Sequence, residues 1–101
     1  MTLYITVKIF GRTGRRGEFR DYETKALNLF RKHGGEIVIA YAPSKDGGQV
    51  DPPDEIQILK IADRSGFESF LNDPERIKMS GERDAVIKRT EVYISDEIIR
   101  Y

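Results

Sequence analysis

The spacing of hydrophobic residues changes at a glycine pair about one third of the way along the chain. Over residues 3–10, apolar side chains occupy every other position, which is typical of a half-buried strand. From Glu18 to His33 they recur every three or four residues and form one helical stripe, with Arg20, Glu23, Lys25 and Arg31 on the other side. Alternation returns after Gly34 and Gly35. The pattern predicts a strand, a helix that ends near His33, and a second strand over residues 36–42.

Residues 43–53 separate this unit from the next one. They are rich in proline, glycine and aspartate, and a segment of that composition predicts a long loop, because proline cannot donate a hydrogen bond to a neighbouring strand. Alternation resumes afterwards, and it predicts a third strand from Glu55 to Ala62.

The second half of the chain predicts helical segments followed by one strand. Ser65 and Glu68 have the spacing of a capping box at the start of a helix. The Asp73-Pro74 pair predicts a new helical start, because Asp caps well and Pro suits the first turn. A further helix is expected over residues 82–89, with Ala85 and Val86 inward, and the last strand over residues 90–95.

The predicted order is βαββαβ in a single domain of residues 1–101, because a chain of this length supports one hydrophobic core. This order is that of the α+β, ferredoxin-like arrangement, a four-stranded antiparallel sheet with its two main helices on one face. The other face remains to be covered. It is expected to carry a partly apolar set of side chains: Tyr4, Thr6, Lys8, Phe10, Ile56, Ile58 and Lys60. We therefore expect a symmetric homodimer that stacks the two sheets.

Composition narrows the classes of partner. The 17 basic residues balance the 17 acidic ones, so no net field favours nucleic acid or an anionic membrane. The chain has no cysteine, which excludes disulfides and thiolate metal sites and favours a reducing compartment. Its first residues have no secretory pattern, and no apolar run reaches the length of a membrane span. We expect a cytoplasmic protein.

Several short features follow the order of a known group of proteins. They are Tyr22, the His33-Gly34-Gly35 junction, the turn Ala62-Asp63-Arg64-Ser65, Phe67, the Asp73-Pro74 pair and Arg83. In this order the chain resembles the dimeric α+β barrel superfamily, and within it a small uncharacterised family of about this length with a tyrosine, a helix-ending Gly-Gly and a later arginine. The chain differs from that family in its long loop over residues 43–53 and in having no tryptophan.

The resemblance implies an architecture and a pocket between sheet and helices. Members of the superfamily include cofactor-independent monooxygenases, muconolactone isomerases, haem-degrading enzymes and ligand-sensing domains. The function it implies is a cofactor-independent enzyme, monooxygenase- or isomerase-like, that acts on a small organic acid or aromatic. One alternative is a non-catalytic ligand-binding or structural homodimer, and a second is a haem-binding protein.

Tyr22, Glu23 and Arg83 are the most interesting candidates for chemistry. If Arg83 follows the family position, it lies near the mouth of the pocket, where a guanidinium can hold a carboxylate or enolate oxygen by two parallel hydrogen bonds. Tyr22 could donate a hydrogen bond to the same oxygen. The structural alternative makes Tyr22 a core aromatic and pairs Arg83 with Glu82, Asp84 or a helix end.

His33 is the third catalytic candidate, because it is the only histidine and histidine titrates near neutral pH. Its place in the last turn of a helix has a structural explanation, since the helix dipole favours a cation there. No second histidine or metal-binding spacing accompanies it, so we expect no metal site. Haem bound through His33 is the only cofactor considered, and no cofactor is assigned.

The loop Gly11–Gly17 lies between a strand and a helix, where phosphate-binding loops occur. It matches neither the dinucleotide fingerprint nor the P-loop, although four arginines, counting Arg20, make its surroundings electropositive. It can bind an anion or form a solvated turn.

An RNA-recognition motif shares the βαββαβ order, but its stacking aromatics lie on the third strand. Here Phe67 and Phe70 have helical spacing instead, so we expect no nucleic-acid partner.

Overall fold

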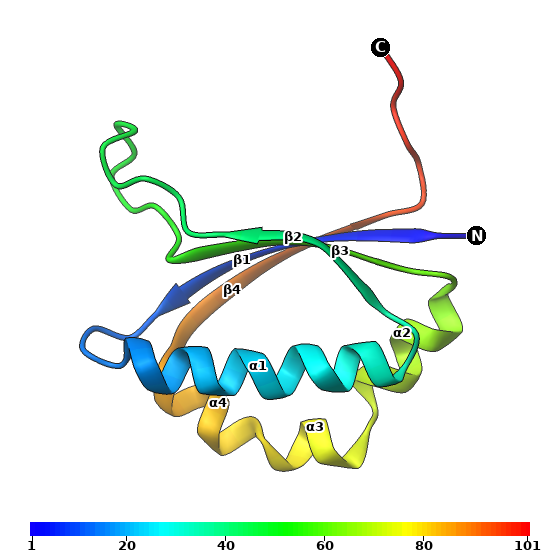
Figure 1. The fold of residues 1–101 in the computed structure, drawn as a ribbon, viewed down its shortest axis with the longest axis horizontal. Coiled ribbons are helices and arrows are strands. Elements are labelled where there is room, and N and C mark those ends of the chain that lie inside the picture. Colours follow the sequence, from blue (N-terminus) through cyan, green and yellow to red (C-terminus); the bar gives the residue numbers. More distant parts are fainter.

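The computed structural model describes all 101 residues and has two layers, an antiparallel sheet and a layer of helices on one of its faces (Figure 1). The strand order is β2-β3-β1-β4, which confirms the ferredoxin-like α+β fold. The elements in chain order are β1 (Leu3–Gly11), α1 (Arg16–Lys32), β2 (Glu36–Tyr41), β3 (Glu55–Ile61), α2 (Arg64–Leu71), α3 (Pro74–Lys78), α4 (Ser80–Val86) and β4 (Ile87–Ser95).

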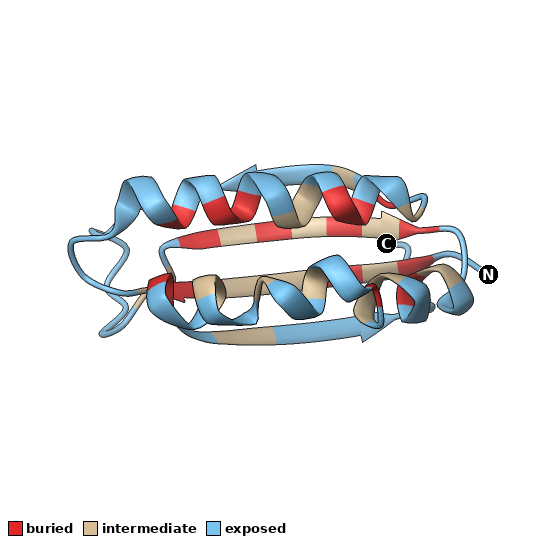
Figure 2. Ribbon diagram, turned by 90° about the horizontal axis from the view of Figure 1, so that it is seen from below, coloured by how far each residue is buried: buried red, intermediate tan, exposed pale blue.

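The pairing of the central strands decides which side chains enter the core. Ile5 of β1 lies opposite Leu59 of β3 on one side and Ile94 of β4 on the other. Because side chains alternate along a strand, this register sends the odd-numbered residues of β1 and β3 toward the helices. Figure 2 shows buried residues along the helix and strand surfaces that face each other. Leu3, Ile5 and Ile9 are buried on this side of the sheet.

The core consists of two hydrophobic clusters. One surrounds Phe30 near the end of α1 and contains Leu3, Ile5, Leu59, Ile61 and Phe67. The other lies near the start of α1 and contains Ile9, Phe19, Tyr22, Val86 and Ile87.

The junction between α1 and β2 follows the prediction. Gly34 has a φ of +88°, and its backbone N–H donates to the carbonyl of Arg31 at 2.9 Å. Gly35 donates to the carbonyl of Phe30 at 3.0 Å. A left-handed residue that ends a helix in this way is most favourable as glycine.

The start of α2 differs from the prediction. The capping residue is Asp63, whose Oδ1 accepts from the Gly66 backbone N–H at 2.8 Å. Ser65 is the second residue of the helix. The Ser65 hydroxyl donates to the same Oδ1 at 2.8 Å. Hydrogen bonds from Gly66 and Ser65 lower the pKa of Asp63. The capping box at Ser65 was therefore wrong, because an ionised Asp two residues earlier is the stronger acceptor.

The second crossover contains three short helices in place of one main helix. Asp73 caps α3, where its Oδ1 accepts from Glu75 N–H at 2.8 Å and Pro74 occupies the first turn, as predicted. The helix expected over residues 82–89 is wrong at its end, because β4 begins at Ile87. The Arg12 backbone N–H donates to the Val86 carbonyl at 2.9 Å. This hydrogen bond joins the end of α4 to the end of β1, next to the point where β4 begins. Ala85 is exposed, whereas Val86 is buried.

Two segments rise from the sheet on the side away from the helices. Figure 1 shows the β2–β3 loop at one end and residues 96–101 at the other, with the uncovered face between them. None of the helices combines the length and apolar content needed to span a lipid bilayer.

Replacement of Gly35 by alanine should destabilise the fold, because the new Cβ would lie 2.2 Å from Cε2 of the buried Phe30 ring. Overpacking of this kind lowers the free energy of unfolding by about 1–3 kcal/mol, which urea denaturation measures. Gly81→Ala is the matched control, because nothing lies within 4 Å of its Cβ position in α4. It should be neutral or gain up to about 1 kcal/mol. Equal stability of the two variants would contradict this packing.

Candidate functional site

A cavity of about 290 Å³ lies between the sheet and the helix layer. Strands β1, β3 and β4 form its floor, and α1 and the α2–α4 segment supply its walls. Fourteen of its nineteen lining residues are hydrophobic, so the cavity favours an apolar or aromatic occupant. The other five lining residues are polar and come from five different elements: Glu23, Gln57, Arg76, Arg83 and Thr90. The hydroxyl of Tyr22 adds a further polar group to the lining.

Glu23 is a buried carboxyl held in place by an amide. The Gln57 Nε2 donates to the Glu23 Oε2 at 2.9 Å and to the Glu55 Oε2 at 2.7 Å. All three side chains are more than nine-tenths buried. The two amide hydrogens of Gln57 therefore satisfy one oxygen on each carboxyl group, and they fix the direction in which Glu23 points.

The surroundings of Glu23 favour its protonated form. Burial raises its pKa from 4.5 to about 7, and the nearby Glu55 carboxyl acts in the same direction. The hydrogen bond from Gln57 and the charge of Arg83 lower the pKa and so oppose part of this effect. A carboxyl group with a pKa near 7 can both accept and return a proton at neutral pH.

Arg83 brings a cation from α4 to the same cavity. Its Nη2 donates to the Thr90 Oγ1 at 3.2 Å, and its Nη1 lies 3.6 Å from the Asp84 Oδ1. The contact with Asp84 is at the solvent side, where an ion pair is weak. Arg83 thus pairs with Asp84 and also lines the cavity, and its role in holding a ligand stays a prediction.

Tyr22 lies beside these groups and is 5% exposed. Burial, followed by the charge of Glu23, raises the pKa of its hydroxyl, whereas Arg83 acts in the opposite direction. The phenol is therefore neutral at physiological pH. No buried polar side-chain atom lacks a hydrogen-bond partner, and the Tyr22 hydroxyl makes no hydrogen bond within the protein. The hydroxyl therefore reaches solvent-accessible space and can donate to a ligand.

The sequence candidates are only partly brought together. Tyr22 and Arg83 line one cavity, and their catalytic roles stay predictions. His33 does not line it: its Nε2 lies 2.7 Å from the Asp73 Oδ2, and its ring meets Phe70 edge-on with the centroids 6.3 Å apart. The hydrogen bond from His33 is the main cause that lowers the pKa of Asp73. His33 thus links the end of α1 to the start of α3, and a haem ligated by it stays a prediction.

Glu23 was expected on the solvent side of α1, and this expectation is wrong. The residue lies four positions after Phe19 and four before Leu27, so helical geometry places it on the buried stripe. In β3 the inward positions alternate as Glu55, Gln57, Leu59 and Ile61. Polar residues on the inward face of two neighbouring elements were the signal that could have identified this site. No group of three or more metal-ligating side chains occurs in the structure.

Comparison with known proteins supports the fold. No family model matches the chain, and no curated protein matches it. Among solved structures, a protein of unknown function from Rhodopseudomonas palustris is similar with a TM-score of 0.80 and 15% identity, over 98% of this chain and 84% of that one.

Two further structures carry family names. A DABB family protein with a ferredoxin-like fold from Mesorhizobium loti has a TM-score of 0.68 and 10% identity, over 96% of this chain and 97% of that one. A NIPSNAP family protein of unknown function from Agrobacterium tumefaciens has a TM-score of 0.67 and 15% identity, over 93% and 86%. At these identities the similarity concerns the fold alone, and the tyrosine, Gly-Gly and arginine pattern stays a prediction.

The raised pKa of Glu23 predicts a pH-dependent stability. The folded protein holds this proton more tightly than the unfolded chain, so the contribution is full below pH 4.5 and is lost as the pH rises through about 7. A shift of this size corresponds to at most roughly 3 kcal/mol. Glu23→Gln keeps an acceptor for Gln57 and cannot ionise. Urea denaturation should therefore show its stability increasing relative to the wild type as the pH rises over this range.

Asp21→Asn is the control, because Asp21 is an exposed carboxyl on the same helix. Its stability relative to the wild type should change far less between pH 4.5 and about 7. If the difference in free energy of unfolding between Glu23→Gln and the wild type does not change with pH, the prediction is contradicted, because Glu23 then has no raised pKa in the folded protein.

Proposed function

We propose that the protein is a cofactor-independent enzyme that transfers a proton on a small carboxylic acid bound between α1 and the sheet. The observation that carries the proposal is the buried Glu23 carboxyl, with a pKa of about 7, beside an apolar cavity that Arg83 and Tyr22 also line. Such a pKa suits a general base at neutral pH, and an arginine and a neutral phenol suit the charge that a deprotonated substrate acquires.

The shape and lining of the cavity support a small substrate with an apolar body. Its volume of about 290 Å³ lies just below the range of typical small-molecule sites, roughly 300–1,000 Å³, so it suits a small ligand. The apolar lining suits a single ring, and Arg83 suits a carboxylate or enolate at one end of it. An aromatic 2-oxo acid combines these features with an acidic carbon next to the carbonyl group.

The proposed step is an isomerisation that needs no oxidant or reductant. The Glu23 carboxylate takes a proton from the carbon next to the substrate carbonyl, and the electron pair of that C–H bond moves to the carbonyl oxygen as an enolate. Arg83 and Tyr22 donate hydrogen bonds to the developing negative charge. Glu23 then returns the proton to the oxygen or to another carbon. Gln57 positions the Glu23 carboxyl throughout.

Phenylpyruvate is a suitable probe, because its keto and enol forms differ in ultraviolet absorbance. The wild type should accelerate their interconversion, and kcat should depend on a group that titrates near pH 7. Glu23→Gln should lower kcat by about 10²-fold or more, the usual contribution of a general base. Arg83→Gln should raise KM, because it removes the partner of the carboxylate. Asp21→Asn should leave both constants unchanged.

Two results would oppose an enzymatic role. Binding of phenylpyruvate and other aromatic acids with no acceleration of any proton exchange would favour the non-catalytic ligand-binding alternative. Acceleration that survives in Glu23→Gln would remove Glu23 as the base. Proton exchange at the probe's C3 in deuterium oxide, followed by NMR, distinguishes these two results.

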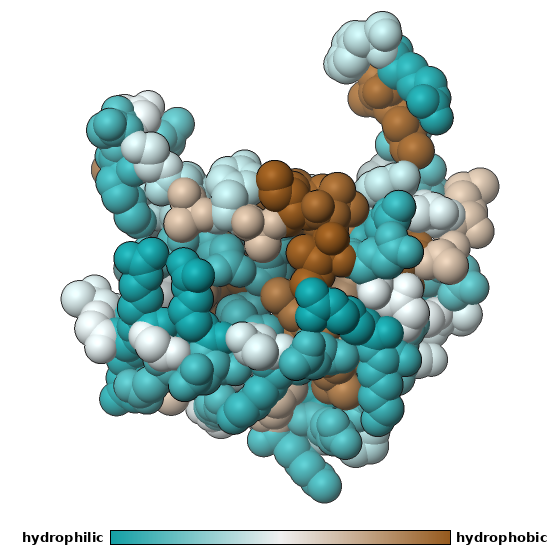
Figure 3. Space-filling model, in the orientation of Figure 1, coloured by the Kyte–Doolittle hydropathy of each residue, from teal (hydrophilic) through white to brown (hydrophobic).

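We further propose that the protein forms a homodimer through the uncovered face of the sheet. Large hydrophobic side chains remain exposed on this face, including Ile39 at 53%, Tyr41 at 46% and Tyr93 at 55%. Figure 3 shows apolar atoms gathered along the β2 side of the sheet and again on residues 96–101. An apolar surface of this kind is usually covered by a partner.

The occupant that fits best is a second copy of the chain. The face carries both signs of charge along its strands, with Lys8 and Arg89 near Glu91, so two copies related by a two-fold axis can place opposite charges together. The β2–β3 loop and residues 96–101 rise at opposite ends of the face (Figure 1). Each copy therefore has two segments that can contact the second copy.

Light scattering with size-exclusion chromatography tests the dimer. The wild type should elute at twice the mass of the chain, and Ile39→Glu should shift the equilibrium to the monomer, because it places a charge within the proposed contact. Ile77→Glu is the control, since Ile77 is 58% exposed on α3 in the helix layer. A monomeric wild type, or equal effects of the two variants, would contradict the proposed interface.

A further inference from the structure

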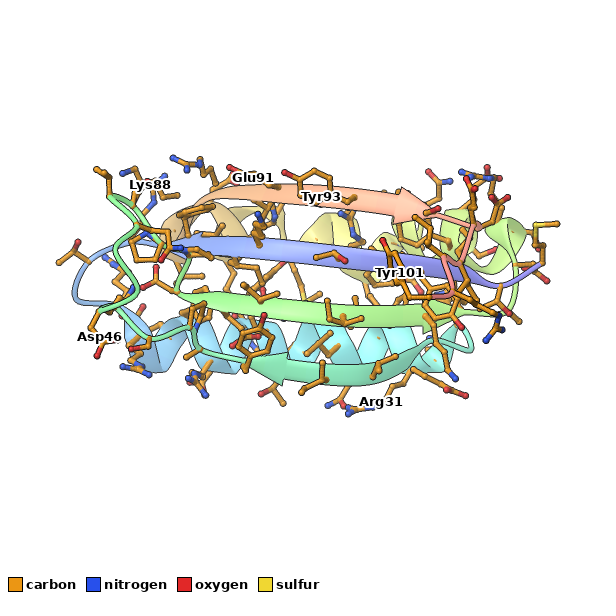
Figure 4. The ribbon with its side chains drawn as sticks, turned by 90° about the horizontal axis from the view of Figure 1, so that it is seen from above. Arg31, Asp46, Lys88, Glu91, Tyr93 and Tyr101 are labelled. Atoms are coloured by element: carbon orange, nitrogen blue, oxygen red, sulfur yellow. The ribbon has the colours of Figure 1, made fainter.

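A second and wider basin lies at the end of the sheet where α1 begins. It has a volume of about 740 Å³ and lies between the β1–α1 loop, the start of α1 and the β2–β3 loop. In Figure 4 this end carries Lys88 and Asp46, whereas Arg31 lies farther along α1, beyond the middle of the molecule. The basin shares no lining residue with the cavity of Tyr22 and Glu23.

The basin contains an excess of positive charge. Five basic side chains line it, Arg12, Arg16, Arg20, Lys45 and Lys88, against two carboxylates. Both carboxylates already have partners. Asp54 accepts from the Gly11 backbone N–H at 2.7 Å and from Lys45 at 3.2 Å, and Asp51 pairs with Arg89 at 3.3 Å.

The four remaining cations have no carboxylate partner. Arg12, Arg16, Arg20 and Lys88 form no ion pair, although they come from three separate parts of the chain. Arg16 and Arg20 are one helical turn apart, a spacing at which like charges repel. The chain as a whole has no net charge, so this concentration is a local feature.

Arg12 is positioned by the protein. Its Nε donates to the Asp84 carbonyl at 2.8 Å, and its backbone N–H donates to the Val86 carbonyl at 2.9 Å. These contacts tie the β1–α1 loop to the end of α4 and leave both terminal nitrogens of the Arg12 guanidinium free to bind a ligand.

We propose that this basin binds a small molecule that carries a pyrophosphoryl group. Guanidinium groups match phosphate oxygens through paired hydrogen bonds, and the site offers three of them together with an ammonium group. Its volume falls in the range of metabolite sites and greatly exceeds the space that a single inorganic ion fills. Asp51 and Asp54 in its lining disfavour a long polyanion such as RNA, which would pass close to them.

Isothermal titration with inorganic pyrophosphate at physiological ionic strength tests the proposal. The wild type should bind pyrophosphate at one site and more tightly than it binds inorganic phosphate. The double variant Arg16→Gln with Arg20→Gln should weaken binding by at least about tenfold, because each lost charged hydrogen bond is worth that much or more. Added salt should weaken wild-type binding as well.

Arg31→Gln with Arg64→Gln is the matched control. It removes the same charge from two exposed arginines without ion pairs that do not line the basin, and it should leave pyrophosphate affinity unchanged. Absence of pyrophosphate binding would overturn the proposal. Equal weakening of pyrophosphate binding in the two double variants would also overturn it, because that result would indicate a diffuse effect of charge. Binding of a single-stranded RNA that pyrophosphate cannot displace would overturn it as well. Circular dichroism confirms that each variant is folded.

Discussion

The register of β1 between β3 and β4 is the constraint on which the other features depend. It aligns Ile5 with Leu59, so the same face of β1 and β3 receives the core residues. A shift by one residue would exchange the two faces and place Lys8 against the helices. The same register puts Gln57 under α1, where it reaches Glu23. The core, the polar site and the uncovered face therefore have one common origin.

The parts of the fold that depend on local pattern were predictable from the sequence. Alternation located the four strands, and Gly34 marked the end of α1 because its backbone conformation suits no other residue as well. The start of β4 was not predictable in this way. Ile87 joins the sheet by pairing with Gly11, more than seventy residues earlier in the chain. The spacing of hydrophobic residues around Ile87 cannot reveal such a distant contact.

In the candidate site too, some residues could be identified from local pattern and others depend on contacts between distant parts of the chain. Tyr22 and Arg83 were identified from the sequence, and they line one cavity. Glu23 was named with them as a candidate, but it was placed on the solvent side of the helix, where charged residues usually lie. Its burial depends on Gln57 in a different element, and only their contact makes the position tolerable. A carboxyl group kept in a core lowers stability at neutral pH, and such a cost is common at functional sites.

The direct passage from α4 into β4 has a mechanical consequence. Val86 ends the helix and Ile87 begins the strand, so no loop separates them. Arg83 lies on the last turn of α4 and also holds Thr90 in β4. The guanidinium group is therefore joined to the edge strand twice, through the chain and through this hydrogen bond. Thr90 lines the cavity and also belongs to the strand at the edge of the sheet, so a single strand connects the wall of the interior cavity to the edge of the sheet.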